Sequence, residues 1–119
     1  MEEGKKFDGG KLRYDLIPPE ALKSLVEIYT YGANKYGERN WEKGILYSRI
    51  YAAVMRHLQD WFMGEEYDRE SGLHHLSHAT WGLFTLRAYV DREMLEFDDR
   101  MKFSEYNQWK EGGSPPDPL

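Results

Sequence analysis

The sequence contains no cysteine among its 119 residues, which excludes disulfide frameworks, cysteine zinc sites and thiol nucleophiles. It also lacks an apolar run of membrane-spanning length, because charged residues make up 31% of the chain and the mean hydropathy is −0.80. A transmembrane protein is therefore excluded. The first residues hold no apolar segment of the secretory kind, so we expect a cytoplasmic protein.

Positive charge is in short supply as well. The chain has 16 basic and 21 acidic side chains and a net charge of −5, which argues against non-specific binding to nucleic acid. The balance is uneven, since residues 1–60 carry 10 basic and 9 acidic groups and residues 61–119 carry 6 and 12. A phosphate-rich ligand between the halves would be neutralised by the basic side chains of one and by cations held on the acids of the other.

Three stretches have the helical period, in which apolar side chains recur every three or four residues. They predict helices over residues 19–35, 48–64 and 73–90, with Ser48 as the cap of the second and the start of the third inside a run of acids. Glycine-spaced residues 32–44 predict an ordered loop. The side chains expected on the inward faces include Leu22, Leu25, Val26, Tyr29, Ile50, Ala53, Val54, Leu58, Trp61, Leu76, Ala79, Leu83 and Phe84.

No strand alternation and no internal repeat is present, so the predicted fold is an all-α bundle of three to four helices. Residues 91–101 read equally well as an extension of the third helix or as a fourth. Residues 1–18 predict an extended arm, residues 19–110 the domain with the chemistry, and residues 111–119 a disordered tail. A bundle this small is expected to gain core by self-association, as a homo-oligomer.

All four histidines fall between positions 57 and 78, among several carboxylates. His57 and Asp60 are three residues apart in one predicted helix, as are His75 and His78 in the next, so each pair points to one side of its helix. Imidazoles with carboxylates suit Mn²⁺, Co²⁺, Ni²⁺ or Zn²⁺, and carboxylates with water suit Mg²⁺. The candidate metal ligands are His57, Asp60, Asp68, Glu70, His75 and His78. The alternative is a core histidine at 57 beside a solvated acidic loop.

Basic and aromatic side chains of the first half are candidate substrate contacts. Arg56 directly precedes His57, and Lys35 lies in the glycine-bracketed segment, where backbone can approach an anion. Tyr36 and Trp41 could stack on a nucleobase or could equally anchor the loop. No P-loop, Rossmann, nucleophile-elbow or zincin motif occurs, so the chemistry is expected from the helical cluster.

Four ordered blocks resemble the phage and bacterial dATP/dGTP diphosphohydrolase family of the MazZ type. The blocks span residues 11–19, 31–41, 56–58 and 64–79, and the resemblance runs from about residue 11 to residue 89. The family is a branch of the MazG-like all-α nucleoside triphosphate pyrophosphohydrolases. The resemblance therefore implies a dimeric or tetrameric enzyme that uses Mg²⁺ or Mn²⁺ to convert purine deoxynucleoside triphosphates to monophosphates and pyrophosphate, in the bacterial host if phage-encoded.

The site expected from this resemblance joins the metal ligands to phosphate and base contacts. Metal-activated water would attack a phosphorus atom in line, with Glu70 as an alternative general base. Arg56 and Lys35 would act on the phosphates during catalysis. The expected substrate-binding residues are Lys11, Arg13, Lys35, Tyr36, Asn40, Trp41 and Arg56.

The chain departs from the MazG pattern, whose two helices hold metal through E-E-x-x-E and E-x-x-D. The corresponding places here read Arg56-His57-Leu58-Gln59-Asp60 and His75-Leu76-Ser77-His78, so Glu27, Glu38, Glu65 and Glu66 stay open as substitute ligands. Two other functions are weighed against the first. One is an HD-type phosphohydrolase, which the absence of a His-Asp dipeptide disfavours, and the other is a non-catalytic helical binding module.

Overall fold

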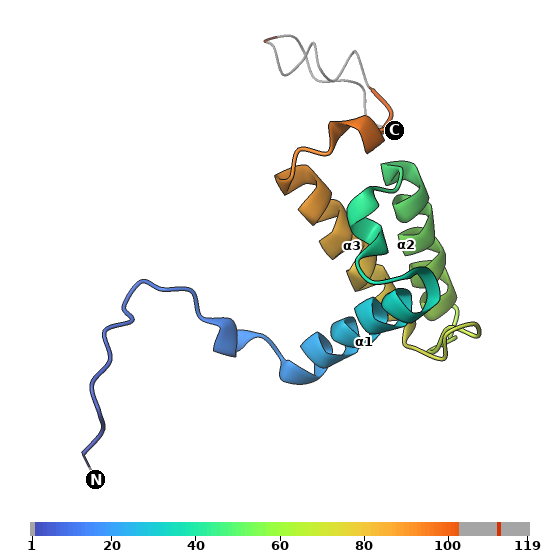
Figure 1. The fold of residues 1–119 in the computed structure, drawn as a ribbon. Helices are drawn as coiled ribbons and strands as arrows, with labels where there is room; N and C mark the ends of the chain where they lie inside the picture. Colours follow the sequence, from blue (N-terminus) through green and yellow to red (C-terminus); the bar gives the residue numbers. More distant parts are fainter. Residues whose placement is uncertain (1, 103–111, 113–119) are drawn as a thin grey trace.

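Three α-helices form the body of the protein in the computed structural model, which describes residues 2–102 and 112 (Figure 1). Their bounds, with those of three short 3₁₀ turns, are η1 Tyr14–Leu16, α1 Pro19–Tyr36, η2 Asn40–Lys43, α2 Tyr47–Phe62, α3 His75–Asp91 and η3 Leu95–Phe97. The all-α prediction is confirmed, with one isolated β-bridge, between Tyr67 and His74, in the described chain. None of the described helices is long and apolar enough to cross a membrane.

Helices α2 and α3 lie side by side, and α1 crosses them at one end and packs on α3 (Figure 1). Glycine brings the first pair close, since a Cβ atom on Gly82 of α3 would collide with the Cγ2 atom of Val54 on α2. The core around this contact contains Tyr47, Ile50, Val54, Ala79 and Tyr89. The helix hairpin is therefore the structural base of the domain.

The α1–α3 seam is more polar. Leu25 and Ile28 are the buried apolar side chains of α1. Beside them the Ser24 and Ser77 hydroxyls lie 2.6 Å apart, and the Tyr29 and Thr85 hydroxyls 3.1 Å apart. These bonds satisfy polar groups that burial would otherwise leave without water.

Several boundary predictions are wrong. The predicted helix over residues 19–35 is confirmed as α1, and the overlapping loop prediction is wrong for residues 32–36, because a glycine inside a helix is tolerated when the flanking residues stay helical. The cap of α2 is Leu46, and Ser48 lies inside the helix with its N–H and hydroxyl on Asp99. Helix α3 begins at His75, after the acidic run, and the run itself forms a tight loop.

The segment after α3 is neither an extension nor a fourth α-helix within the described residues. Glu93 has a φ of 54°, a left-handed conformation that ends the helix, and η3 follows. Phe97 of η3 then lies against Gly44, where a Cβ atom would collide with the ring. The predicted tail, residues 111–119, lies outside the described residues apart from Gly112.

The inward faces were also only partly predicted. Leu25, Ile50, Val54 and Ala79 are buried as expected, but α3 turns small and polar side chains inward, such as Ser77, Gly82 and Thr85. Side chains predicted to be inward but found exposed are Leu22, Val26, Leu58, Trp61, Leu76, Leu83 and Phe84. The reason is that a helix with apolar residues on two faces does not show in its sequence which face meets the neighbouring helix.

The glycine contact gives a stability prediction. Gly82→Ala is expected to lower the free energy of unfolding by about 2 kcal/mol, because the added methyl group overpacks the α2–α3 contact. The matched control is Gly32→Ala in α1, where a Cβ atom meets nothing within 4 Å. That change is expected to raise stability by about 0.5 kcal/mol through helix propensity. Urea denaturation followed by circular dichroism measures both, and equal effects would contradict the assigned contact.

Candidate functional site

A cavity of about 930 Å³ opens between the C-terminal half of α1, the loop through η2, and α2. This volume is in the range of small-molecule sites. Ten of the thirteen predicted site residues line it, namely Lys35, Tyr36, Asn40, Trp41, Arg56, His57, Asp60, Asp68, Glu70 and His78. Residues from distant predicted blocks therefore share one hollow.

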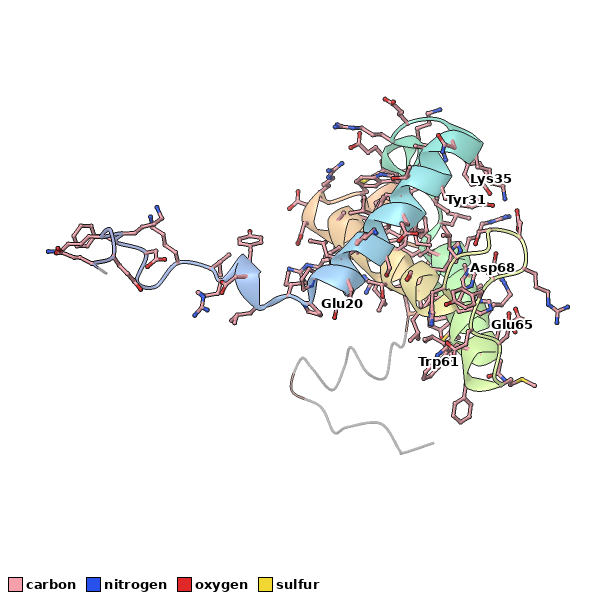
Figure 2. All side chains as sticks on the ribbon, turned by 90° about the horizontal axis from the view of Figure 1, so that it is seen from below. Glu20, Tyr31, Lys35, Trp61, Glu65 and Asp68 are labelled. Carbon is pink, nitrogen blue, oxygen red and sulfur yellow. The ribbon has the colours of Figure 1, made fainter. Side chains whose placement is uncertain are left out.

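The loop between α2 and α3 closes one end of this cavity. Figure 2 shows Lys35 and Tyr31 at the end of α1 near Asp68 of this loop, whereas Glu20 lies at the other end of α1. Asp68 shapes the loop, since its Oδ2 atom accepts the backbone N–H groups of Glu70 and Ser71 at 3.1 and 2.8 Å. The carboxylate is thereby fixed in position by its own turn.

Three histidine rings from α2 and α3 meet beside Asp68. The Nδ1 atoms of His57 and His75 lie 2.8 Å apart. The His78 ring stacks on the His57 ring with centroids 4.4 Å apart and an interplanar angle of 5°. His75 is buried, with 1% of its surface exposed, and its Nε2 atom lies 2.9 Å from a Glu65 oxygen.

Two groups of side chains in the described residues converge closely enough to hold a metal ion. One is His57, Asp68 and His75, and the other is Asp60, Glu65 and His75, each with donor atoms within 4.8 Å of one another. Neutral imidazole and carboxylate donors fit a divalent cation. The predicted ligands His57, Asp60, Asp68 and His75 are therefore brought together.

The remaining two predicted ligands are used differently. The Nε2 atom of His78 lies 2.7 Å from the Ser71 hydroxyl, and its ring packs on His57. Glu70 forms an ion pair with Lys35 at the mouth of the cavity. Ser71, which the sequence analysis did not single out, therefore links the Asp68 turn to His78. An aspartate followed three and four residues later by serine and glycine, Asp68, Ser71 and Gly72, was the available signal for a turn.

The surroundings of the cluster favour the neutral form of His57 and His78 and the charged form of Asp68 and Glu65. Burial lowers the pKa of His78 to about 4, and burial lowers that of His57 as well. Although burial acts to raise it, hydrogen bonds from Ser71 hold the pKa of Asp68 below its usual range. The hydrogen bond to His75 lowers the pKa of Glu65. Neutral imidazoles beside carboxylates have free lone pairs for a cation.

His74 has a separate role, consistent with its omission from the predicted ligands. Its Nδ1 atom accepts the N–H of Leu76 at 3.0 Å and so caps α3, and its Nε2 atom lies 2.8 Å from Glu66.

Two predicted substrate contacts, Lys11 and Arg13, are not brought to the cavity. They line a separate hollow on the arm, where Arg13 pairs with Asp15, and the arm runs away from the helices (Figure 1).

The two aromatic side chains of the cavity differ. Trp41 is packed on several sides, edge-on to Tyr29 at 6.0 Å, beside Tyr89 at 6.4 Å and under the Arg92 guanidinium at 4.9 Å. The buried Tyr89 hydroxyl also donates to the Trp41 carbonyl at 2.5 Å. Tyr36 is 61% exposed. Of the two roles left open for Trp41, the packing favours a loop anchor, and Tyr36 has the more exposed ring.

Fold and cavity together define the class: a helical domain in which the α2–α3 hairpin and its loop carry a cluster of histidines and carboxylates next to cationic side chains. Comparison with known proteins identifies the family. Residues 1–100 match the family model described as "dATP/dGTP diphosphohydrolase, N-terminal". The chain belongs to this family.

A curated relative agrees with this assignment. The chain is 39% identical over 80 residues to a protein of Salmonella phage PMBT28 named dATP/dGTP diphosphohydrolase. That similarity covers 67% of this chain and 27% of the relative, so the chain matches only about a quarter of the relative's length. No solved structure matches.

The contrast between the two aromatic residues is testable. Trp41→Ala is expected to lower the free energy of unfolding by about 3 kcal/mol, because it removes a packed indole from beside the core. Tyr36→Ala serves as the matched control and is expected to cost less than about 1 kcal/mol, since its ring is mostly in water. Urea denaturation measures both. A Trp41 variant as stable as the Tyr36 variant would contradict the anchoring role.

Proposed function

We propose that this chain is a metal-dependent pyrophosphohydrolase that converts dATP and dGTP to the monophosphates and pyrophosphate, in the cytoplasm of a bacterial host. The observation that carries the proposal is the single cavity in which Lys35 and Arg56 lie with the cluster of His57 and Asp68. Hydrolysis of a triphosphate needs positive charge next to the phosphate oxygens and a Lewis acid held in place at the scissile bond. The substrate class follows the family description and the name of the phage relative.

His57, Asp68 and His75 are the side chains that would hold the divalent ion, Mg²⁺ or Mn²⁺, and Asp60 stands next to them. When bound, the ion supplies Lewis-acid polarisation of phosphoryl oxygens and acidifies water. The protein contributes rigidity, because the Asp68 turn and the stacked rings of His57 and His78 hold the donors before a substrate arrives. Such fixed donors lower the cost of reorganisation during reaction.

The basic and acidic side chains of the cavity have different roles in the proposed reaction. Lys35 and Arg56 neutralise the charge that gathers on the leaving pyrophosphate. Glu70, held by Lys35, is the candidate general base and takes a proton through a water molecule. The same ion pair raises the pKa of Lys35, so the ammonium stays charged. A substrate phosphate that takes over Lys35 frees the Glu70 carboxylate at the moment of binding.

We place the base of the nucleotide against Tyr36. Its ring is exposed at the end of α1, and the Lys35 ammonium lies 5.1 Å from the ring centroid. Base stacking on an aromatic ring contributes about 1–3 kcal/mol to binding. Asn40 lines the same cavity and is the side chain available for hydrogen bonds to the base or sugar.

The first test is product analysis. The purified 119-residue chain is incubated with each dNTP and NTP, in Mg²⁺ and separately in Mn²⁺, and the products are separated by chromatography. We expect monophosphate and pyrophosphate, fastest with dATP or dGTP. Release of phosphate or tripolyphosphate, as from an HD-type enzyme, would overturn the proposal. So would the absence of turnover, which would favour a binding module.

The variant Asp68→Asn tests the proposed role of Asp68 as a metal ligand. The amide keeps the shape of the side chain but loses the negative charge that attracts the ion, so kcat is expected to fall at least about 100-fold. Glu20→Gln, at the far end of α1, is the control and keeps full activity (Figure 2). Circular dichroism checks that both variants fold. An Asp68 variant with more than a tenth of the activity would contradict the proposed ligand.

We also propose that the chain self-associates, as a dimer or tetramer. Seven apolar side chains are buried among the described residues. The outward face of α3 keeps Leu83 and Phe84 more than half exposed, and α2 exposes Phe62 at 79%. A second copy of the chain presents the same apolar faces and can cover them by a two-fold contact.

The oligomer is tested by sedimentation velocity. The chain is expected to sediment as a dimer or tetramer, and Leu83→Glu is expected to shift it to the monomer, because a charge would be buried in the contact. Lys23→Glu, an exposed charge change on α1, is the control and should leave the oligomer intact. A monomeric wild type would contradict self-association.

A further inference from the structure

A carboxylate, two imidazoles and a second carboxylate form a continuous chain in the α2–α3 hairpin. Glu65 Oε1 lies 2.9 Å from His75 Nε2, and His75 Nδ1 lies 2.8 Å from His57 Nδ1. Asp68 completes the group, because its carboxylate and one nitrogen of each ring all lie within 4.8 Å of one another. His75 is at the centre of this chain and is almost fully buried. Both of its ring nitrogens are therefore engaged by protein atoms.

The partners decide which nitrogen of His75 carries the proton. An ionised carboxylate only accepts hydrogen bonds, so Nε2 of His75 must donate to Glu65. A neutral imidazole has one N–H group, which leaves Nδ1 of His75 with a lone pair. That lone pair faces Nδ1 of His57, which must then donate its own proton across the 2.8 Å contact when no cation is present. Glu65 thus sets the tautomers of two rings in sequence.

The same arrangement fits a cation. Bonds of about 2.1 Å that meet near a right angle place two neighbouring nitrogen ligands about 3 Å apart, close to the separation of the two Nδ1 atoms. A histidine that binds metal through one nitrogen usually donates the N–H of the other to a carboxylate. Glu65 stands in that position towards His75, and its other oxygen is held by the Arg69 guanidinium at 3.1 Å. The donor set therefore has its outer support already in place.

We propose that Glu65 is a positioning residue that holds His75 as the Nε2–H tautomer. Nδ1 of His75, Nδ1 of His57 and the Asp68 carboxylate then bind an imidazole-preferring ion such as Mn²⁺, Co²⁺ or Zn²⁺ in preference to Mg²⁺. The inference rests on the metal requirement proposed above and names the class of ion. Two nitrogen donors favour these ions, whereas Mg²⁺ prefers oxygen ligands and water. On binding, the Nδ1 proton of His57 leaves to solvent and Nε2 takes one up, so the ring stays neutral.

The neighbouring pair provides a matched control within the same loop. Glu66 contacts Nε2 of His74 at 2.8 Å, much as Glu65 contacts His75. Nδ1 of His74, however, accepts the Leu76 N–H at the start of α3, so its lone pair is already used. The two carboxylates make similar bonds, but only the one on His75 supports a nitrogen that faces other donors.

The first experiment reads the tautomers directly. Long-range ¹H–¹⁵N correlation spectra of the metal-free 119-residue chain are expected to show His75 as Nε2–H and His57 as Nδ1–H. Adding Zn²⁺ is expected to convert His57 to Nε2–H and to shift both Nδ1 resonances, whereas Mg²⁺ alone leaves them unchanged. His75 found as Nδ1–H, or Mg²⁺ shifting the same nitrogens as Zn²⁺, would overturn the inference.

The second experiment measures Co²⁺ binding by titration calorimetry. Removing Glu65 as Glu65→Ala is expected to weaken Co²⁺ binding about 10-fold or more with one ion still bound. Glu65→Gln is expected to recover part of the loss, because its amide oxygen still accepts the His75 N–H. Glu66→Ala is expected to change the affinity less than about twofold. An equal effect of both alanine variants, or the loss of one of two bound ions in Glu65→Ala, would overturn the positioning role.

The outcomes separate this inference from the proposed function. A chain that shows the tautomers and the Zn²⁺ response but no turnover supports the inference and overturns the proposed activity. A chain that hydrolyses dGTP but whose His57 and His75 rings do not respond to Zn²⁺ supports the activity and overturns the inference.

Discussion

The close contact of α2 and α3 at Gly82 is the constraint on which the site depends. Because glycine has no side chain, Val54 enters the space above it, and the two helices approach one another over that turn. One turn further along α2 stands His57, and one turn earlier on α3 stands His78. Rings on facing helices reach stacking distance only if the backbones are this close. Packing in the core thus fixes the distance between the candidate metal ligands.

Hydrogen bonds within the cluster explain why buried polar groups are tolerated in so small a domain. The buried His75 needs partners for both ring nitrogens, and Glu65 and His57 provide them. No buried side-chain nitrogen or oxygen in the described part of the chain is without a partner. The cluster is therefore compatible with folding in the absence of a cation. Its donors are in place beforehand, so binding an ion orders few additional groups.

How much could be read from the sequence depended on whether the signal was local. The three helices and the candidate ligands His57 and His75 follow from periodicity and from spacing along one helix, and these are properties of single segments. The inward face of α3 was not readable, because Leu83 and Phe84 look like core residues until the partner helix is known. The support by Glu65 was missed for a related reason: a carboxylate in an acidic run gains a role only from a loop that folds back on a helix.

The segment after α3 packs back against the start of α2 and the loop before it. Asp99 accepts the N–H of Ser48 at 2.8 Å, so one amide group at the start of α2 is satisfied by a residue more than one helix away in sequence. Phe97 lies on Gly44, and the Arg100 guanidinium lies 5.8 Å from the Tyr47 ring centroid. Residues 97–100 therefore connect the end of α3 to the start of α2 and stabilise the helical hairpin. The family match covers residues 1–100 and so includes all of these contacts.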